Sequence, residues 1–489
     1  MLPPIRLEAS SDVPLYRQLY DQLRLHIQSG RISRGERLPA TRELAGLLGL
    51  NRATVASAYE LLENEGLMKG HVGRGSFVEG EPLPQPRAAW TDLHPSTESL
   101  PHLSMPADGI SFASSRPAGE LFPMEEFRAT CEEVIHGRDA ASILQLGSPS
   151  GYPPLRSYLI EEARASGSAS DSDDILITSG CQQALDLLQR VLIRPGDAVA
   201  LEDPVYPGLR GMFQSAGARL VGVPVGPNGI EPSALRAVLE RDRPRFLIVT
   251  PNFQNPTGAT MPLPARQAIL QLVREAGVIL IENDIYGLLR YEGDPLPSLK
   301  QLAPESDVVS LGSFSKVAFP GLRVGWVIAP HQLISRLQEA KQWCDLHSDQ
   351  LSQAVMFRFA ESGRLAEHRK KVLAAGAERL SAVLSACKRH LPPGSRWTHP
   401  QGGMNLWVRL PEPLDSAELL PRAEAANVNY LPGKYFAVSR TEPGALRLSF
   451  AGLSPARIHE GVAQLGSIFR TELERVRAHR RAAPMPALV

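Results

Sequence analysis

The chain has 489 residues, which is too many for one hydrophobic core and suggests two to four compact units at roughly 150 residues each. Its 52 lysines and arginines balance 52 aspartates and glutamates, so no overall basic field points to nucleic acid. Scattered cysteines and the lack of a long apolar stretch or an apolar leader predict no metal site, export signal or membrane span, and a reduced, cytoplasmic setting is expected.

The first eighty residues predict three helices and a hairpin. A helix is expected from Val13 to Gly30, a short one after Leu38 that runs to Gly49, and a third after Asn51, a suitable N-cap. Strand-like residues 67–69 and 76–78 follow, so the pattern predicts a helix-turn-helix with a wing, or else a three-helix unit with an incidental hairpin. The apolar stripe expected on the first helix is Tyr16, Leu19, Tyr20, Leu23 and Ile27.

Four motifs in this region favour the winged helix-turn-helix. They are Leu38-Pro-Ala-Thr-Arg-Glu-Leu-Ala, Leu48-Gly-Leu-Asn-Arg-Ala-Thr-Val, Ala58-Tyr-Glu-Leu-Leu-Glu-Asn-Glu-Gly-Leu and Gly73-Arg-Gly-Ser-Phe-Val. Together they resemble the GntR family of DNA-binding domains over residues 12–78. The resemblance implies a double-stranded promoter DNA partner, and guanidinium forks and close-approaching glycines suit a duplex. The DNA contacts it implies are Arg42, Arg52, Thr54, Gly73 and Gly75.

Residues 79–110 are expected to be a linker. Prolines recur through this stretch and periodicity disappears, so neither a helix nor a central strand is predicted. Such a segment behaves as a semi-stiff, mostly extended tether. It separates residues 12–78 from a large domain expected at residues 111–470.

Short apolar runs alternate with helical segments beyond the linker. The runs are typical of strands buried on both faces, and together with the intervening helices they predict a three-layer α/β domain with a mostly parallel sheet. Ligands bind such sheets at the carboxyl ends of the strands. The five runs begin at Ile175, Val199, Phe246, Val278 and Val308.

The last of these runs leads into a candidate cofactor site. Ser313, Ser315 and Lys316 follow it, and Arg323 comes shortly after. A lysine amine can form a Schiff base with an aldehyde cofactor, and two hydroxyls with a guanidinium can hold a phosphate. Alone, a Ser-x-x-Lys is weak, because most such lysines are solvated surface residues.

The other four strand ends are polar in a coherent way. Ser179-Gly180-Cys181-Gln182 opens a helix whose N-terminus can bind a phosphate. Tyr206 can stack on a heteroaromatic ring, and Asn255 lies in Pro251-Asn-Phe-Gln-Asn-Pro-Thr-Gly. Asp284 and Tyr286 share one side of an extended segment, where a carboxylate can keep a pyridine nitrogen protonated. Each has an ordinary explanation as a loop residue, but all five together favour one site.

Residues 111–470 resemble pyridoxal phosphate enzymes of fold type I, specifically class I/II aminotransferases with a smaller C-terminal α/β subdomain. The resemblance implies pyridoxal 5′-phosphate as cofactor, with Lys316 carrying the internal aldimine. Asp284 would pair with the pyridine nitrogen, Asn255 and Tyr286 would face the 3′-oxygen, and Tyr206 would stack on the ring. The phosphate would be held by Gly180, Cys181, Gln182, Ser313, Ser315 and Arg323.

Two further residues are implied by the same resemblance. Tyr152 resembles the tyrosine that reaches the phosphate of the neighbouring subunit, which implies a homodimer. Arg447, in Ala445-Leu-Arg-Leu-Ser-Phe, resembles the arginine that binds the α-carboxylate of the substrate, and a fork of donors suits that planar anion.

A GntR-type domain, a proline-rich linker and an aminotransferase-like domain together resemble the MocR subgroup of bacterial regulators. This layout implies a transcriptional regulator that senses pyridoxal phosphate or an amino-compound effector through aldimine chemistry at Lys316. A genuine aminotransferase with a DNA-binding appendage is the main alternative, and an inert dimerisation scaffold is a third. The effector, the sign of regulation, the target genes and the operator spacing are not readable from the residues.

Overall fold

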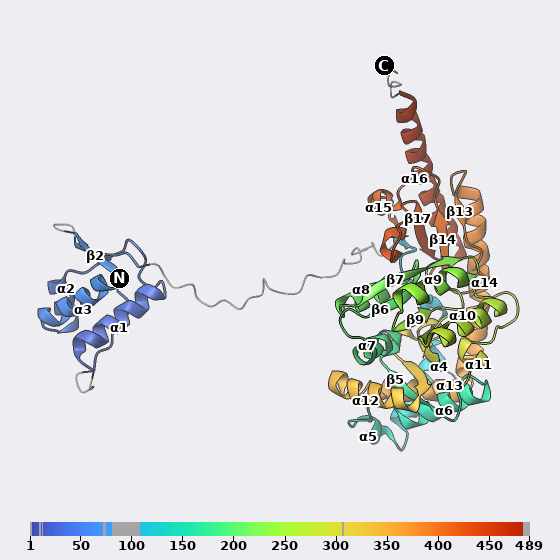
Figure 1. Ribbon diagram of the computed structural model, residues 1–489, viewed down its shortest axis with the longest axis horizontal. Helices are drawn as coiled ribbons and strands as arrows, with labels where there is room; N and C mark the ends of the chain where they lie inside the picture. Colours follow the sequence, from blue (N-terminus) through green and yellow to red (C-terminus); the bar gives the residue numbers. More distant parts are fainter. Residues whose placement is uncertain are drawn as a thin grey trace. The chain divides into compact units, whose positions relative to one another are not determined.

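The computed structural model describes residues 2–8, 11, 13–71, 75–80, 108–305 and 308–482. The chain divides into two compact units, Met1–Pro95 and Ser96–Val489 (Figure 1). In the described ranges, no helix is both long enough and apolar enough to cross a bilayer.

The first unit is a winged helix-turn-helix, as its sequence predicts. Its helices pack around one apolar core that includes Leu19, Leu23, Val55 and Leu62, whereas Tyr16 in the first turn is exposed and does not join the expected stripe. The wing hairpin gains a third strand, in the order β1-β3-β2, which the sequence did not indicate. The elements are α1 (Leu15–Gln28), β1 (Arg37–Leu38), α2 (Thr41–Leu48), α3 (Arg52–Asn64), β2 (Met68–His71) and β3 (Gly75–Val78).

The residues ahead of α1 pack along that helix. The Gln22 side chain accepts a hydrogen bond from Arg6 N at 2.9 Å and donates one to Arg6 O at 2.6 Å. Gln18 makes the same pair of contacts with the backbone of Glu8, at 2.9 and 3.0 Å. Residues 2–8, which precede the expected domain start at residue 12, are therefore tied to the first unit.

An eight-stranded sheet forms the centre of the second unit, in the order β5-β12-β11-β10-β9-β6-β7-β8. Neighbouring strands run parallel except for β12, which is antiparallel to both its neighbours, and β8. The five predicted strands are confirmed as β5 (Asp173–Thr178), β6 (Ala198–Asp203), β9 (Phe246–Val249), β10 (Ile279–Asn283) and β11 (Val308–Ser313). Three further strands were not predicted from the sequence, namely β7 (Arg219–Gly226), β8 (Gly229–Ile230) and β12 (Gly325–Pro330).

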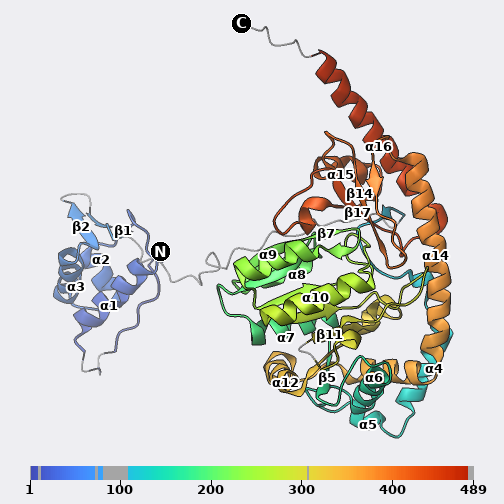
Figure 2. The same cartoon turned by 45° about the vertical axis from the view of Figure 1, so that its right-hand side comes forward.

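Helices cover both faces of this sheet and complete three layers. Alternate side chains of β9 enter different cores, with Phe246 and Ile248 in one and Leu247 and Val249 in the other, because side chains alternate along a strand. Figure 2 shows α9 and α10 lying across the sheet. The helices packed on the two cores are α7 (Gly180–Leu192), α8 (Pro207–Ser215), α12 (His331–Asp345), α9 (Pro232–Asp242) and α10 (Leu263–Ala276).

A smaller subdomain follows at the C-terminal end, as expected. Its antiparallel sheet has the order β13-β14-β17-β16 and consists of β13 (Arg396–Trp397), β14 (Asn405–Arg409), β17 (Ala445–Ser449) and β16 (Leu431–Pro432). It packs against α14 (Arg364–His390), α15 (Ser416–Ala425) and α16 (Pro455–Ala482). The short strand β4 (Ile110–Ser111) pairs with β15 (Val428–Asn429) and so joins the start of the second unit to this subdomain.

Five further helices complete the described part of the second unit. They are α4 (Met124–Ile135), α5 (Ala140–Ile143), α6 (Pro153–Ala165), α11 (Leu299–Leu302) and α13 (Gln350–Glu361). The first residue of α11, Leu299, joins the core of α9 and α10. Short 3₁₀ turns occur at Gly119–Leu121, Phe314–Lys316, Pro320–Leu322 and Gly433–Phe436. The architecture is a three-layer α/β domain with a mostly parallel sheet and a smaller C-terminal subdomain, preceded by a winged helix.

Candidate cofactor and effector site

The predicted site residues meet at a cavity of about 470 Å³ at the carboxyl ends of the parallel strands. This is where ligands bind in open α/β sheets. The predicted residues that line it are Cys181, Gln182, Tyr206, Asn255, Tyr286, Ser313, Ser315, Lys316, Arg323 and Arg447.

Lys316 ends the 3₁₀ turn η2 (Phe314–Lys316) directly after β11. Its Nζ donates a hydrogen bond to Ser115 O at 2.8 Å and lies 5.6 Å from the centre of the Tyr286 ring. Burial lowers the pKa of Lys316 to about 8, and the charge of Arg447 acts in the same direction. The neutral, nucleophilic amine is therefore more abundant than for an ordinary lysine.

The phosphate side of the cavity is built around the N-terminus of α7. Gly180 has a φ of 76°, and a Cβ there would lie 2.4 Å from Nη2 of Arg323. The Arg323 guanidinium donates to Ser179 O at 3.3 Å and approaches the Ser315 hydroxyl at 3.5 Å. Ser313 Oγ donates to Ser315 Oγ at 2.9 Å. A helix N-terminus, two hydroxyls and a guanidinium thus converge on one point, which suits a phosphate.

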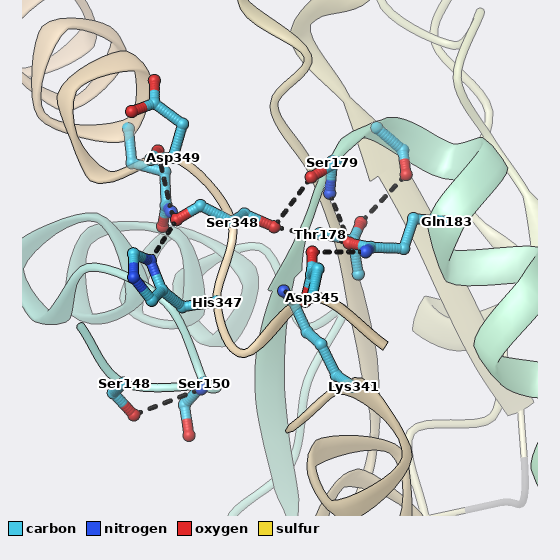
Figure 3. Close-up of polar contacts among 12 residues, drawn as sticks. Ser148, Ser150, Thr178, Ser179, Gln183, Lys341, Asp345, His347, Ser348 and Asp349 are labelled. Atoms are coloured by element: carbon cyan, nitrogen blue, oxygen red, sulfur yellow. Dashed lines mark hydrogen bonds and ion pairs between the residues drawn. The ribbon is translucent and has the colours of Figure 1, made fainter. Parts of the chain in front are cut away.

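A second layer of polar contacts fixes the turn before α7 (Figure 3). The Gln183 side chain accepts from Ser179 N at 2.8 Å and donates to Asp345 at 2.6 Å. Asp345 in turn accepts from the buried Lys341 ammonium at 2.6 Å, and Ser179 Oγ donates to Ser348 Oγ at 3.0 Å. These contacts join α12 to the phosphate turn, and no motif in the sequence predicted them.

Cys181 contributes to this turn through its backbone position. Its Sγ donates to Gly312 O at 3.3 Å, and burial raises the pKa of the thiol to about 12. The side chain is thus a protonated group directed at β11, and the part of Cys181 suited to a phosphate is its N–H.

One side of the cavity carries a chain of hydrogen bonds through Asn255. Its amide nitrogen donates to the Tyr286 hydroxyl at 3.3 Å, and its amide oxygen accepts from Arg447 Nη1 at 3.0 Å. Asn255 and Tyr286 are both buried, whereas Tyr206 is 39% exposed at the N-terminus of α8. The open ring of Tyr206 leaves an aromatic face for a ligand.

Asp284 lies just after β10, at the carboxyl end of the strand, as the sequence analysis predicts for the carboxylate that pairs with the pyridine nitrogen. Burial raises its pKa, while a hydrogen bond from Asn252 and the charges of Arg266 and Arg290 oppose that shift. Asn252 Nδ2 donates to Asp284 Oδ1 at 2.8 Å. A cation placed beside this carboxylate would stabilise its ionised form.

Arg447, on β17, is 3% exposed and has no acidic side chain within ion-pair distance in the described ranges. Its guanidinium donates to Asn255 and to Ala113 O, and its Nε is buried without a hydrogen-bond partner among the described residues. Burial lowers its pKa to about 10. A buried, incompletely paired guanidinium is a good receptor for a carboxylate.

Of the predicted cofactor residues, Gly180 and Asp284 adjoin lining residues of this cavity without being part of its lining, and Tyr152 is not part of it either. It precedes α6, and its ring packs edge-on against Phe357 at 6.3 Å within its own subunit. The contact with a partner's phosphate stays a prediction. The residues that sequence reasoning missed include Ser115 and Asn405, which hydrogen-bond to each other at 2.6 Å beside Lys316, and Asn252.

In the first unit, Asn51 caps α3 by accepting a hydrogen bond from Ala53 N at 3.0 Å, as expected. Arg42 and Arg52 are exposed at the starts of α2 and α3, and Thr54 is half-buried. Gly75 begins β3 with a φ of 102°, and a Cβ there would lie 2.8 Å from Nε of the exposed Arg37, a basic residue that sequence reasoning missed. Gly73 lies outside the described residues.

The cavity fits pyridoxal 5′-phosphate. At one end it has a phosphate receptor made from Gly180 and Arg323, and beside it the amine of Lys316. Asp284 stands in the chain between the lining residues Asn283 and Ile285, and Arg447 offers a separate anion receptor. When bound, this cofactor supplies an aldehyde for amines and an electron-withdrawing ring.

Two parts of the chain match known families. Residues 108–465 match the family described as aminotransferase class I and II, and residues 15–78 match bacterial regulatory proteins of the gntR family. The chain belongs to the class I and II aminotransferases and carries a gntR-type DNA-binding domain ahead of that part. Its cofactor is therefore pyridoxal phosphate.

Relatives of this chain include both enzymes and regulators. It is 40% identical to 2-aminoadipate transaminase of Thermus thermophilus over 73% of this chain and 89% of that protein. It is 30% identical to the probable rhizopine catabolism regulatory protein MocR of Rhizobium meliloti, over 95% of each chain. The second unit resembles solved LysN, α-aminoadipate aminotransferase from Thermus thermophilus complexed with N-(5′-phosphopyridoxyl)-L-leucine, with a TM-score of 0.71 and 39% identity over 75% of this chain and 93% of that one.

Proposed function

We propose that this protein is a pyridoxal phosphate-dependent, DNA-binding transcriptional regulator of the MocR type, acting in the cytoplasm on promoter DNA. The observation that carries the proposal is the presence, in one chain, of a winged helix with exposed Arg42 and Arg52 and a complete cofactor cavity. Relatives that are named as regulators and share both parts over nearly the full length support this reading.

The signal is proposed to be an amino compound with a carboxylate. Its amine would react at the cofactor aldehyde held beside Lys316, and its carboxylate would pair with Arg447. Both cations already contact a single short segment: Lys316 donates to Ser115 O, and Arg447 donates to Ala113 O. A ligand that binds Lys316 or Arg447 competes with the backbone carbonyls of residues 113–115 for that side chain. In the sequence, these residues come soon after the linker from the DNA-binding unit. Only such differential binding can shift a regulator between states.

The working form is proposed to be a homodimer. Four large apolar side chains are between 56% and 89% exposed, namely Leu144, Leu146, Trp343 and Leu346. The two stretches that carry them are held together, because Gln350 Nε2 donates to Gln145 O at 3.0 Å. Exposed apolar side chains gathered in this way favour a protein partner, and a second copy would also place two recognition helices on separate half-sites.

The test is a titration of the cofactor absorbance spectrum with amino acids and with simple amines, repeated with promoter DNA. An active effector should change both the spectrum and the DNA affinity. Arg447→Gln should weaken the binding of amino acids about a hundredfold, since it removes a buried charge partner of their carboxylate. The binding of an amine without a carboxylate should stay unchanged. If neither the cofactor nor any amine alters DNA affinity, the sensor proposal is wrong.

A genuine aminotransferase is the second candidate, because the cavity is lined by Lys316, Tyr286 and Arg447 and the 40% identical relative is named as a transaminase. Sustained turnover with an amino donor and a keto acid, at roughly 1 per second or faster, would favour the enzyme. A single half-reaction without turnover would favour the regulator. An inert scaffold would give no spectral change with pyridoxal phosphate and no difference for Lys316→Ala.

A further inference from the structure

A buried arginine on α10, Arg266, is connected to Asp284 through one side chain. Arg266 is 0% exposed, and its Nη2 donates to Asn252 Oδ1 at 2.6 Å. Asn252 Nδ2 then donates to Asp284 Oδ1 at 2.8 Å. Asn252 is itself 5% exposed, so its hydrogen bond with Arg266 is buried, and the one with Asp284 is partly buried.

The partners of Arg266 are all neutral oxygen acceptors. Besides Asn252, it donates to Met261 O at 2.9 Å, Pro297 O at 2.8 Å and Pro251 O at 3.2 Å. Among the residues that the structure describes, no carboxylate is hydrogen-bonded to this guanidinium, which carries its positive charge next to Asn252. Burial disfavours this charge, which lowers the pKa of Arg266, while the carboxylates of Glu282 and Asp284 favour it.

This arrangement fixes the orientation of the Asn252 amide. A guanidinium has donors only, so Asn252 has to present its oxygen to Arg266. Its NH₂ group then faces Asp284 and offers that carboxylate a donor. A flipped amide would set donor against donor on one side and acceptor against carboxylate on the other, and both contacts would be lost.

The surroundings of Asp284 explain why it needs this support. Glu282, on β10 and two residues before Asp284, is a fully buried carboxylate, and the charge of Asp284 adds to burial in raising the pKa of Glu282. Arg266 and Arg290 bring the opposing positive charges, and the backbone of Gly287 donates a further hydrogen bond to Asp284. Arg290 also lies within 3.5 Å of Asn252 Oδ1, on the same side as Arg266.

We propose that Arg266 and Asn252 are positioning residues that keep Asp284 ionised and aimed at the ring nitrogen of bound pyridoxal phosphate. This inference rests on the proposed function, in which the ring nitrogen of the bound cofactor lies beside Asp284. The hydrogen bonds of Arg266 reach Asp284 only through Asn252, and its positive charge also favours the ionised carboxylate. A cofactor whose ring carries a protonated nitrogen is then bound more tightly than one whose ring has carbon at that position.

The experiment compares two ligands in the full-length protein: pyridoxal phosphate and its deaza analogue, in which carbon replaces the ring nitrogen. Dissociation constants are measured from absorbance for the wild type, Asn252→Ala, Arg266→Met and Arg266→Lys. The readout is the ratio of the two constants, so it does not depend on catalytic activity. Arg379→Lys is the matched control, because Arg379 is another buried arginine, 4% exposed, whose donors reach Leu453 O and Glu120.

We expect the wild type to prefer pyridoxal phosphate at least tenfold, and Asn252→Ala and Arg266→Met to reduce that preference about tenfold. Arg266→Lys keeps the charge and should recover part of it, and Arg379→Lys should leave it unchanged. Variants that weaken both ligands equally, with the wild-type ratio retained, would mean a purely structural role and overturn the proposal. If Arg266→Met does not fold, Asn252→Ala decides. A wild type without any preference would refute the placement of Asp284 itself.

Discussion

The ammonium group of Lys316 donates a 2.8 Å hydrogen bond to the backbone carbonyl of Ser115, a residue 201 positions earlier in the chain. Ser115 lies four residues after β4, the strand that anchors the start of the second unit to the C-terminal subdomain. Its hydroxyl also contacts Asn405 and Ser449, at 2.6 and 3.2 Å. The proposed Schiff-base lysine is thus in contact with the chain that arrives from the DNA-binding unit.

Replacing Lys316 with methionine removes the only side-chain donor recorded for Ser115 O within the described residues. We expect backbone amides of residues 108–118 to exchange with deuterium several-fold faster in this variant, since a lost hydrogen bond lets the segment open more often. Mass spectrometry of the corresponding peptide measures the effect. Asn405→Ala should also loosen the segment, whereas peptides from β9 should not change in either variant. Equal exchange in wild type and Lys316→Met would mean that the contact does not hold the segment.

The lowered pKa of Lys316 predicts how its reaction with pyridoxal phosphate depends on pH. Below about pH 8 the folded protein holds this amine mainly protonated, and above it mainly neutral, whereas an ordinary lysine stays protonated up to 10.5. Only the neutral amine attacks an aldehyde. The rate of the spectral change should therefore rise through neutral pH and level off above about pH 8. A rate that keeps rising to pH 10, as for a free lysine derivative, would contradict the assignment.

Gly180→Ala tests the phosphate turn. The new Cβ would lie 2.4 Å from Arg323 Nη2, and Gly180 also has a φ of 76° that alanine disfavours. We expect a loss of about 1–3 kcal/mol in stability and at least tenfold weaker pyridoxal phosphate binding. Melting temperature and an absorbance titration measure the two effects.

Gly167→Ala is the matched control for that substitution. Gly167 has a φ of 75°, but a Cβ there meets nothing within 4 Å, so it carries the backbone strain without the clash. It should lose a similar amount of stability and bind the cofactor normally. Equal cofactor affinity in Gly180→Ala and Gly167→Ala would remove Gly180 from the phosphate site.

Arg52→Ala tests the recognition helix. Arg52 is exposed at the first position of α3, the end that such helices present to the major groove. Specific DNA binding should weaken by about 1–3 kcal/mol, while the cofactor spectrum stays the same. Fluorescence anisotropy with promoter DNA measures the affinity. Arg17→Ala, which removes an exposed charge from α1, is the control. Loss of DNA binding and of the cofactor spectrum together would contradict separate roles for the two units.

Much of the site could be predicted because each residue follows a recognisable strand. Buried parallel strands appear as apolar runs, and their ends meet at one edge, so Asn255, Asp284 and Lys316 were brought together from position alone. The structure places Asn255 and Lys316 in the lining of one cavity and Asp284 between the lining residues Asn283 and Ile285, and their individual roles toward the cofactor stay predictions. Strand β12 was missed although its run Trp326-Val-Ile-Ala is apolar like those of its neighbours β5 and β11, and its antiparallel direction is set by the sheet and not by any local pattern.

By itself, the sequence determined the two kinds of unit, the fold class and the identity of the cofactor, since these depend on local motifs and hydrophobic periodicity. Only the tertiary structure decided which residues hold the site residues in place. Arg266, Asn252 and Ser115 look like ordinary residues in the sequence, and their roles arise from contacts across distant segments. Hydrogen-bond partners and burial are set by how helices and strands pack, and no local pattern encodes that arrangement.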